Sequence, residues 1–297
     1  MRAPVALAFA LAFAGVAAPG LTTAQEKKLN VVTTSTDLKS LVEAVGGERV
    51  EVESLAAPDH DPHAVEVKPA QMARLRRAAL VVRVGLDHEP WLARLKTDAP
   101  VVDASRGVRL LQTETPRLRV ERKAHVHAFG NTHYWLDPQN ARPITASIFE
   151  ALTRLSPADK PRFDANRQAF LTRLDARLAD WTATLAPYRG TKLVVIHDSW
   201  AYFADRFGLA IAAAAEPTPG VPPSPAELAA LFKRMREAGV RVVIADPHSD
   251  PSLVRQISGR GGARAVTLFP SVGAGAGAAD YISLFDVNVK RLATALQ

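Results

Sequence analysis

The chain has 297 residues, of which 47% are hydrophobic and 23% charged, a usual balance for a globular protein with room for one large domain or two medium ones. It contains no cysteine, which excludes disulfides, thiolate metal sites and a lipid-modified N-terminal cysteine. The net charge of +7 does not indicate nucleic-acid binding, because the arginines are scattered along the chain and are not clustered with aromatic residues.

Residues 1–24 have the pattern of a cleaved secretory signal peptide. Arg2 is followed by an apolar run of small residues from Ala3 to Ala18, and then by a polar segment with a cleavage site near Ala24. The run is too short and too rich in alanine for a membrane anchor, and no later stretch approaches the roughly 20 apolar residues that a membrane helix needs. We therefore expect an exported protein.

Residues 28–140 alternate between strand and helix patterns and predict an N-terminal α/β lobe. A strand is expected at 29–33, before a helix that ends at Gly46-Gly47, and the alternating stretch at 50–56 predicts a second strand. After a helical stretch at 68–78, the continuous apolar run at 79–85 is typical of a strand buried in a parallel sheet.

Residues 141–187 hold helical periodicity throughout and predict two successive helices, of which the second is long. Strands and helices alternate again from 188 to 297, which predicts a C-terminal α/β lobe. The predicted fold class is α/β, with two Rossmann-like lobes that contain parallel sheets and are joined by a long rigid α-helix. Such a spine should allow only small hinge or shear movements.

Three of the eight histidines lie just past the end of an apolar strand or at a loop that enters a helix. They are His63, His133 and His197. Ligands collect at the carboxyl ends of strands in open α/β sheets, so these side chains are placed to converge between the lobes. Neutral imidazole is the commonest metal ligand, and three histidines with one oxygen ligand form a tetrahedral zinc pattern.

Three segments carry a specific resemblance: "DPHAVEVKPAQMARL", "NTHYWLDPQNA" and "HDSWAYFADRFGL". Together, and in this order, they resemble the histidine motifs of the zinc/manganese solute-binding proteins of ABC importers, the cluster A-I group that includes the ZnuA and TroA types. The resemblance covers nearly the whole mature chain. It implies that His63, His133 and His197 bind a metal in the periplasm, for delivery to an ABC transporter membrane permease.

Zinc is the metal that these residues favour. Manganese-selective relatives tend to place a carboxylate at the third position, whereas this chain has His197. Three imidazoles suit borderline-soft zinc better than manganese, which prefers oxygen ligands. We therefore expect Zn²⁺ as the transported ligand, with Mn²⁺ as the weaker alternative.

The fourth ligand departs from the family pattern. Many relatives have an aspartate after the strand that reads "AVTLFPSVG" here, and this chain has no carboxylate in that stretch. Asp246, at the end of "VRVVIAD", is the preferred fourth ligand. The alternatives are water, Glu216, His60, His125, His127 and His248.

Other interpretations stay open at this point. A zinc-dependent hydrolase would need an open coordination site and a carboxylate base, and an adhesin or metal chaperone with the same site would differ only in its partner. The loop with His125 and His127 could hand over zinc, for example to or from a periplasmic metallochaperone, or be incidental. His88, in "GLDHEPW", is interpreted as surface or local structure. We expect a monomer that is not an enzyme and binds no nucleic acid.

Overall fold

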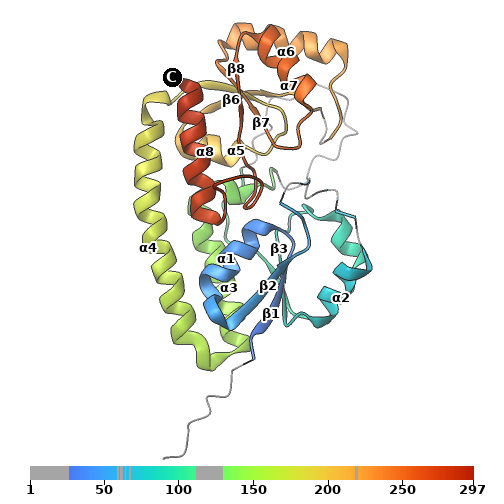
Figure 1. The fold of residues 1–297 in the computed structure, drawn as a ribbon, viewed down its shortest axis with the longest axis vertical. Helices are drawn as coiled ribbons and strands as arrows, with labels where there is room; N and C mark the ends of the chain where they lie inside the picture. The colour runs from blue at the N-terminus through green and yellow to red at the C-terminus, as the bar shows by residue number, and fades with distance from the viewer. Residues whose placement is uncertain are drawn as a thin grey trace, which may run out of the picture.

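The computed structural model of the chain describes residues 27–58, 60, 63, 65–66, 68–111, 130–217 and 220–297. It contains two parallel four-stranded sheets, one in each lobe, with helices on both faces (Figure 1). The predicted α/β class, with two lobes and a long connecting helix, is confirmed. The predicted signal peptide and the pair His125 and His127 lie outside the described residues.

The N-terminal sheet has the strand order β2-β1-β3-β4, and every pairing in it is parallel. Its two faces are covered by different helices, because alternate residues of a strand point to opposite sides. Val31 packs into the core on the α1 side, whereas Val32 packs with Leu75 of α2. The elements of this lobe are β1 (Leu29–Thr33), α1 (Thr36–Gly46), η1 (Gly47–Arg49), β2 (Val50–Ser54), α2 (Pro69–Arg77), β3 (Leu80–Arg83), η3 (Pro90–Arg94) and β4 (Val101–Asp103).

The C-terminal sheet repeats this plan with the order β6-β5-β7-β8. One of its strands, β6, was not predicted, because its sequence "AIAAA" has a single β-branched residue and no alternation. Its pairing with β5 is irregular between Leu193 and Val194. The elements are β5 (Lys192–Val195), α5 (Ala201–Phe207), β6 (Ala210–Ala214), α6 (Pro225–Ala238), β7 (Val242–Ala245), α7 (Pro251–Gly261) and β8 (Arg264–Thr267).

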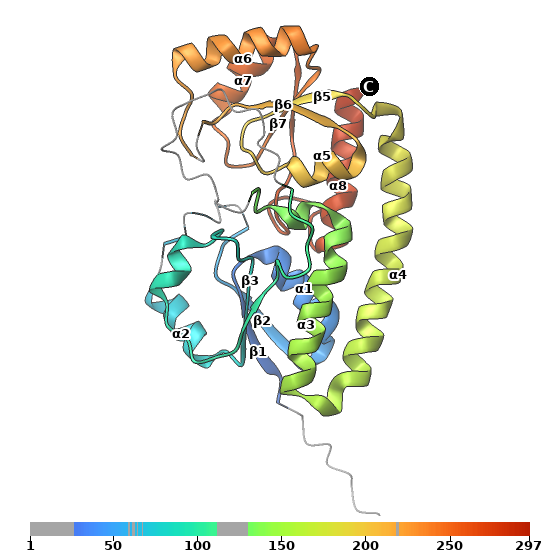
Figure 2. The same ribbon diagram turned by 180° about the vertical axis from the view of Figure 1, so that it is seen from behind.

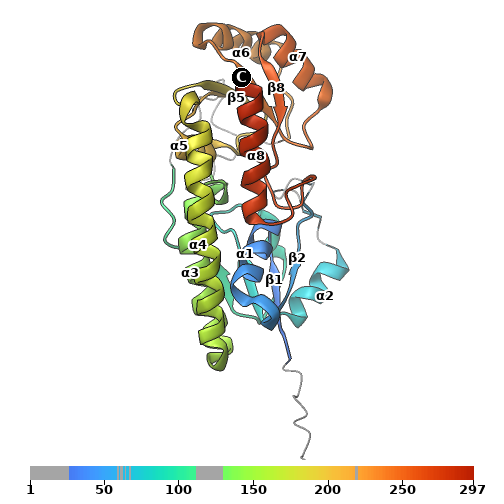
Figure 3. The ribbon, with the colours of Figure 1, turned by 60° about the vertical axis from the view of Figure 1, so that its left-hand side comes forward.

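A helical hairpin connects the two sheets. Helix α3 (Ala141–Leu155) is followed by the short turn η6 (Pro157–Asp159) and by α4 (Lys160–Leu185), which has 26 residues and is therefore about 39 Å long. Figures 2 and 3 show α4 running along one side of both lobes. Its start is tied to the N-terminal lobe by Arg49, whose Nε donates to Asp159 Oδ2 at 2.8 Å. The turn η7 (Ala186–Tyr188) leads from α4 to β5.

The last helix, α8 (Tyr281–Leu296), lies beside α4 (Figure 3). Asp286 of α8 accepts hydrogen bonds from Arg177 Nε at 3.0 Å and from Trp181 Nε1 at 2.8 Å, both on α4. Phe285 adds an aromatic contact to Trp181, with ring centroids 5.2 Å apart. The connection between the lobes is therefore two packed helices, which resist bending better than one.

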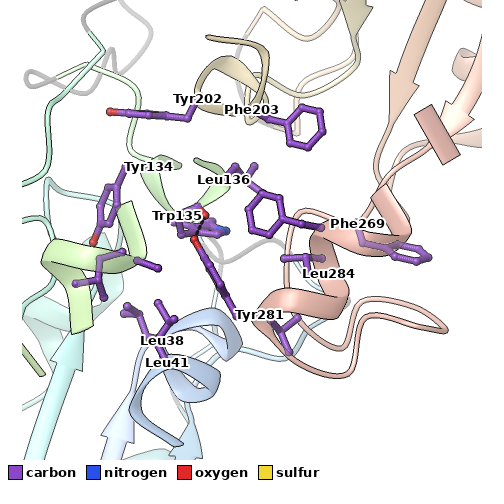
Figure 4. Close-up of a cluster of buried hydrophobic side chains, with 14 of the residues drawn as sticks. Leu38, Leu41, Tyr134, Trp135, Leu136, Tyr202, Phe203, Phe269, Tyr281 and Leu284 are labelled. Carbon is purple, nitrogen blue, oxygen red and sulfur yellow. Dashed lines mark hydrogen bonds between the residues drawn. The ribbon is translucent and has the colours of Figure 1, made fainter. Parts of the chain in front are cut away.

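The hydrophobic core is continuous from one lobe to the other. Figure 4 shows side chains of α1, α5, α8 and the turn η4 (Tyr134–Leu136) gathered in one cluster. Trp135 lies at its centre: its Nε1 donates to Pro270 O at 2.9 Å, and its carbonyl accepts from Tyr281 Oη at 2.5 Å. Truncating such a buried aromatic side chain typically lowers the free energy of unfolding by about 3–5 kcal/mol. Because separating the lobes would remove the contacts of this side chain, the core opposes wide separation.

A buried carboxylate also spans the lobes. Asp37, in the first turn of α1, accepts a hydrogen bond from Val272 N at 2.9 Å, in the segment that follows β8. Burial raises the pKa of Asp37 from 3.8 to about 7, although the hydrogen bond from Val272 opposes the rise. Nearby, Ser40 Oγ accepts from Tyr281 N at 3.0 Å. One face of α1 is thus completed by residues from the other end of the chain.

The raised pKa of Asp37 predicts that the stability of the fold depends on pH. The folded state binds more protons than the unfolded chain between about pH 4 and pH 7, so Asp37 lowers the free energy of unfolding as pH rises through this window. Asp37→Asn keeps an oxygen that can accept from Val272 N and removes the charge. We expect this variant to gain stability over the wild type at pH 8 and to lose that advantage toward pH 4.

Urea unfolding at pH 4.5, 6 and 8 measures this difference. Glu150→Gln, which removes an exposed carboxylate from α3, is the matched control. A variant whose unfolding midpoint stays at a constant offset from that of the wild type across the three pH values would contradict the account of Asp37.

Candidate metal centre

The three predicted histidines come together between the two sheets. His63 lies beyond the carboxyl end of β2, His197 lies beyond the end of β5, and His133 directly precedes η4. The ring centroids are 5.2 Å apart for His63 and His133, 5.5 Å for His133 and His197, and 6.1 Å for His63 and His197. The two lobes therefore contribute to one cluster of imidazoles.

Each of these rings is anchored through its Nδ1 atom to an oxygen of the protein. His63 Nδ1 lies 3.0 Å from the carbonyl oxygen of His88, and His197 Nδ1 lies 3.1 Å from Glu216 Oε2. His133 Nδ1 lies 3.1 Å from Asn131 Oδ1. Since Asn131 Nδ2 donates to the carbonyl of Asp198 at 2.8 Å, its Oδ1 is the atom that faces His133. Such outer partners fix the orientation of metal-binding imidazoles.

The anchors determine which nitrogen of each ring carries the proton. Carbonyl, carboxylate and amide oxygens only accept hydrogen bonds, so Nδ1 is the donor in His63, His133 and His197. In the neutral form of each ring, Nε2 then carries a lone pair. The site therefore presents lone pairs to whatever lies between the rings.

Two of these Nε2 atoms face each other at 3.3 Å, those of His63 and His133. Two acceptors at that distance repel each other unless a cation lies between them, either a proton on one ring or a metal ion. Nitrogens that are both bound to one tetrahedral zinc, each about 2.0–2.1 Å from it, lie about 3.3–3.4 Å apart. The observed separation is therefore that of two ligands already set for one ion.

The site is largely shielded from water. His133 and His197 are only 6% and 7% exposed, whereas His63 is half-buried. The ring of Trp135 packs against His133 at 5.2 Å between centroids. The next turn is held across the lobes, since Asp137 accepts two hydrogen bonds of 2.6 Å from Arg206 of α5. These contacts fix His133 on a rigid support.

A fourth histidine, His88, lies in the same cluster. It is fully buried, and its ring centroid is 4.2 Å from that of His63 and 5.3 Å from that of His133. The interpretation of His88 as a surface residue is therefore wrong. The rule that selected the other histidines would have found it, because His88 follows the carboxyl end of β3 by five residues. Its turn includes Leu86 and Asp87 with φ of 57° and 56°.

Ligand-capable atoms of His63, His88 and His133 all lie within 4.8 Å of one another, and no other trio of such side chains in the described part of the chain is as compact. Neither His197 nor Asp246 is in this trio. Asp246 is buried, its Oδ1 accepts from Trp200 Nε1 at 2.9 Å, and its Oδ2 has no hydrogen-bond partner among the described residues. Burial raises the pKa of Asp246 to about 6 against the opposing effects of His197 and His248.

The other candidates for a fourth ligand among the described residues are Glu216, which supports the site through His197, and His248 and His60, which are exposed. Glu216 is the hydrogen-bond partner of His197, and it also accepts from Gly220 N at 3.1 Å. His248 is exposed, with its ring 6.2 Å from that of His197, and His60 is also exposed. His125 and His127 lie outside the described residues.

The stretch "HDS", from His197 to Ser199, contains the three residue types of a serine hydrolase triad but not the triad's geometry. Ser199 is buried and its Oγ has no hydrogen-bond partner among the described residues. His197 Nδ1 bonds to Glu216, as the histidine of a triad bonds to its acid, but no hydrogen bond joins His197 to Ser199 Oγ. The serine is therefore not activated by this histidine.

A two-lobed α/β fold with a buried imidazole cluster between the lobes is the architecture of a metal-binding solute-binding protein. The chain belongs to the family of the periplasmic component A of zinc-uptake complexes, whose model matches residues 31–295. None of the helices in the described ranges is both long enough and apolar enough to cross a membrane.

Known relatives and solved structures agree with this assignment. The high-affinity zinc uptake system protein ZnuA of Brucella abortus is 29% identical over 165 residues, 56% of this chain and 48% of that protein, so the match spans about half the length of that relative. A crystal structure of ZnuA superimposes with a TM-score of 0.79 at 27% identity and covers 91% of this chain and 100% of that one. FpvC from Pseudomonas aeruginosa, in complex with Mn²⁺, gives a TM-score of 0.77 at 25% identity, with 91% and 99% covered.

The hydrogen bond between His197 and Glu216 predicts how the metal site responds to mutation. Outer carboxylate partners typically contribute about 10–100-fold to metal affinity. We expect Glu216→Ala to weaken Zn²⁺ binding by that factor, and Glu216→Gln to weaken it less, because an amide oxygen can still accept from Nδ1. Competition with a chromophoric chelator measures the affinity. Glu237→Ala, at an exposed position on α6, is the control, and equal affinity of Glu216→Ala and the wild type would contradict the role of Glu216.

Proposed function

We propose that this protein binds Zn²⁺ with high affinity in the periplasm and delivers it to an ABC-type membrane permease for import. His63, His133 and His197 are the proposed ligands. The observation that carries the proposal is the separation of 3.3 Å between His63 Nε2 and His133 Nε2, with Nδ1 of each ring held by an oxygen acceptor, which suits two ligands of one metal ion. Membership of a zinc-uptake family supports the same cargo.

Zinc is favoured over manganese by the donor atoms. Imidazole nitrogens suit the borderline-soft Zn²⁺, whereas Mn²⁺ prefers carboxylate, carbonyl and water oxygens. The Mn²⁺ complex of FpvC indicates that this fold itself does not select the metal, so the donor set has to. Competition of Zn²⁺ against Mn²⁺ in calorimetry tests this choice, and tighter binding of Mn²⁺ would contradict it.

Delivery to a permease, with no chemistry on the metal, fits the rest of the site. The predicted signal peptide at residues 1–24 would place the chain in the periplasm, without a lipid-modified cysteine. We propose a monomer that is not an enzyme and whose partner is an ABC permease, with a periplasmic metallochaperone as a further partner. The hydrolase alternative predicts zinc-dependent ester or amide turnover that is lost in His133→Ala.

The proposed ligands predict a clear pattern in affinity. Replacement of His63, His133 or His197 by alanine should in each case weaken Zn²⁺ binding by more than about 100-fold. Each change removes a whole ligand, and this loss is larger than the usual effect of removing an outer hydrogen-bond partner. Isothermal titration calorimetry with a competing chelator gives the dissociation constants, and circular dichroism confirms that each variant folds. Unchanged binding in any two of the three variants would remove this site from consideration.

Zinc binding should weaken as the pH falls. Each ligand has to be a neutral imidazole, and an ordinary imidazole has a pKa of about 6.5, so protons compete with the metal below that value. We expect the Zn²⁺ affinity to be nearly constant above pH 7.5 and to fall by at least about tenfold between pH 6.5 and 5.5. Titrations at these pH values test this, and an affinity independent of pH would argue against histidine ligands.

A further inference from the structure

We propose that His88 is the fourth ligand of the metal, so that the ion is bound by four imidazoles and not by three imidazoles and a carboxylate. This inference rests on the proposed function, since it concerns the same ion. Two observations carry it: His88 is fully buried, and its ligand-capable atom lies within 4.8 Å of those of His63 and His133.

His88 is anchored like the other three histidines. Its Nδ1 lies 2.8 Å from Oγ1 of Thr132, a residue that is itself fully buried and directly precedes His133. A hydroxyl can donate or accept, so this contact does not fix the tautomer of His88 by itself. In the tautomer in which Nδ1 donates to Thr132, Nε2 carries the lone pair that a metal would take, as at the other rings. The four imidazoles then share one design, in which Nδ1 is held by an oxygen of the protein and Nε2 is directed to the metal.

The spacings of the His63, His88 and His133 rings are near those of ligands around one ion, and the ring centroid of His197 lies 5.5 Å from that of His133 and 6.1 Å from that of His63. In a tetrahedral zinc site bound through Nε2, the ring centroids lie roughly 5 Å apart. The centroid of His88 is 4.2 Å from that of His63 and 5.3 Å from that of His133. The backbone adds a further link, because the carbonyl of His88 accepts from His63 Nδ1. His88 thus orients His63 through its backbone carbonyl and offers its own ring as a further ligand.

The two carboxylates considered as ligands are less well placed than His88. Glu216 orients His197. Asp246 uses Oδ1 for Trp200 Nε1, and although its buried Oδ2 has no hydrogen-bond partner among the described residues, Asp246 lies outside the compact group of His63, His88 and His133. Four neutral imidazoles would leave the charge of the bound ion uncompensated within the shell. Glu216 and the buried Asp246 then offset that charge from outside it.

A complete nitrogen shell has consequences for both selectivity and chemistry. Oxygen-preferring Mn²⁺ gains little from a fourth imidazole, whereas Zn²⁺ accepts four nitrogen ligands in a closed tetrahedral site. Closed sites leave no position for a reactive water. His88 therefore favours zinc over manganese and also disfavours hydrolytic activity.

Zinc K-edge X-ray absorption of the Zn²⁺-loaded protein tests the proposal, because the scattering of the imidazole ring gives the number of bound histidines. We expect four in the wild type and three in His88→Phe. Phenylalanine keeps an aromatic ring beside Trp135 and retains the backbone carbonyl that holds His63. We also expect His88→Phe to weaken Zn²⁺ binding by at least about tenfold, with a smaller effect on Mn²⁺.

Two further variants separate ligation from packing. Thr132→Val preserves the shape of the residue and removes the anchor of His88, so it should weaken Zn²⁺ binding only if His88 is a ligand. His248→Gln, at the exposed histidine beside His197, should leave the number of bound imidazoles and the affinity unchanged. Asp246→Asn tests the rival ligand directly.

The possible outcomes are distinct. A wild-type spectrum with three imidazoles and one oxygen, together with unchanged affinity in His88→Phe, would overturn the role of His88 and leave the proposed function standing. A wild type that does not bind Zn²⁺ would overturn the proposed function and this inference with it. If His88→Phe does not fold, the wild-type spectrum and Thr132→Val still decide the question.

Discussion

The structure depends on a constraint between two imidazole nitrogens. His63 Nε2 and His133 Nε2 are held 3.3 Å apart while both Nδ1 atoms are committed to oxygen acceptors. This is the separation of two nitrogens bound to one tetrahedral zinc ion. A metal ion between the rings would form a coordinate bond to each, and the protein holds both rings in place for it.

The fold supplies the rigidity that this arrangement needs. Trp135 bonds to Pro270 and Tyr281, and Asp137 bonds to Arg206, so the turn that carries His133 is attached to the C-terminal lobe at several points. The paired helices α4 and α8 reinforce this attachment along one side (Figure 3). Large opening of the lobes would break these contacts together. Exchange of the metal therefore has to rely on small local movements near the cluster.

Much of this could be predicted from the sequence, because the signals were local. Continuous apolar runs predicted most of the strands, and helical periodicity over 141–187 predicted the long helix. The strand β6 was missed because alanine-rich stretches carry no strand preference. Position after a strand selected His63 and His197, and position at a loop that enters a helix selected His133. The structure brings these three rings into one cluster.

The parts that could not be predicted depend on side-chain contacts between distant residues. His88 follows the end of β3, so the rule that selected the other histidines applies to it, but its burial and its contacts with Trp135 and Thr132 are seen only in the folded structure. The attachment of Glu216 to His197 likewise depends on how the loop after β6 folds back. The choice between Asp246 and His88 as a fourth ligand is a question of distances that no sequence pattern encodes.

The contacts of α1 also determine the order in which the chain can fold. Asp37 bonds to a residue 235 positions later, and Ser40 to one 241 positions later. Loop closure over such separations is slow, and these two contacts cannot form until the chain has been synthesised as far as Val272 and Tyr281, respectively. Until then α1 lacks part of the surface against which it packs. The N-terminal lobe therefore reaches its final state only when nearly the whole polypeptide is present, and a chain of this topology stays incompletely folded during its synthesis.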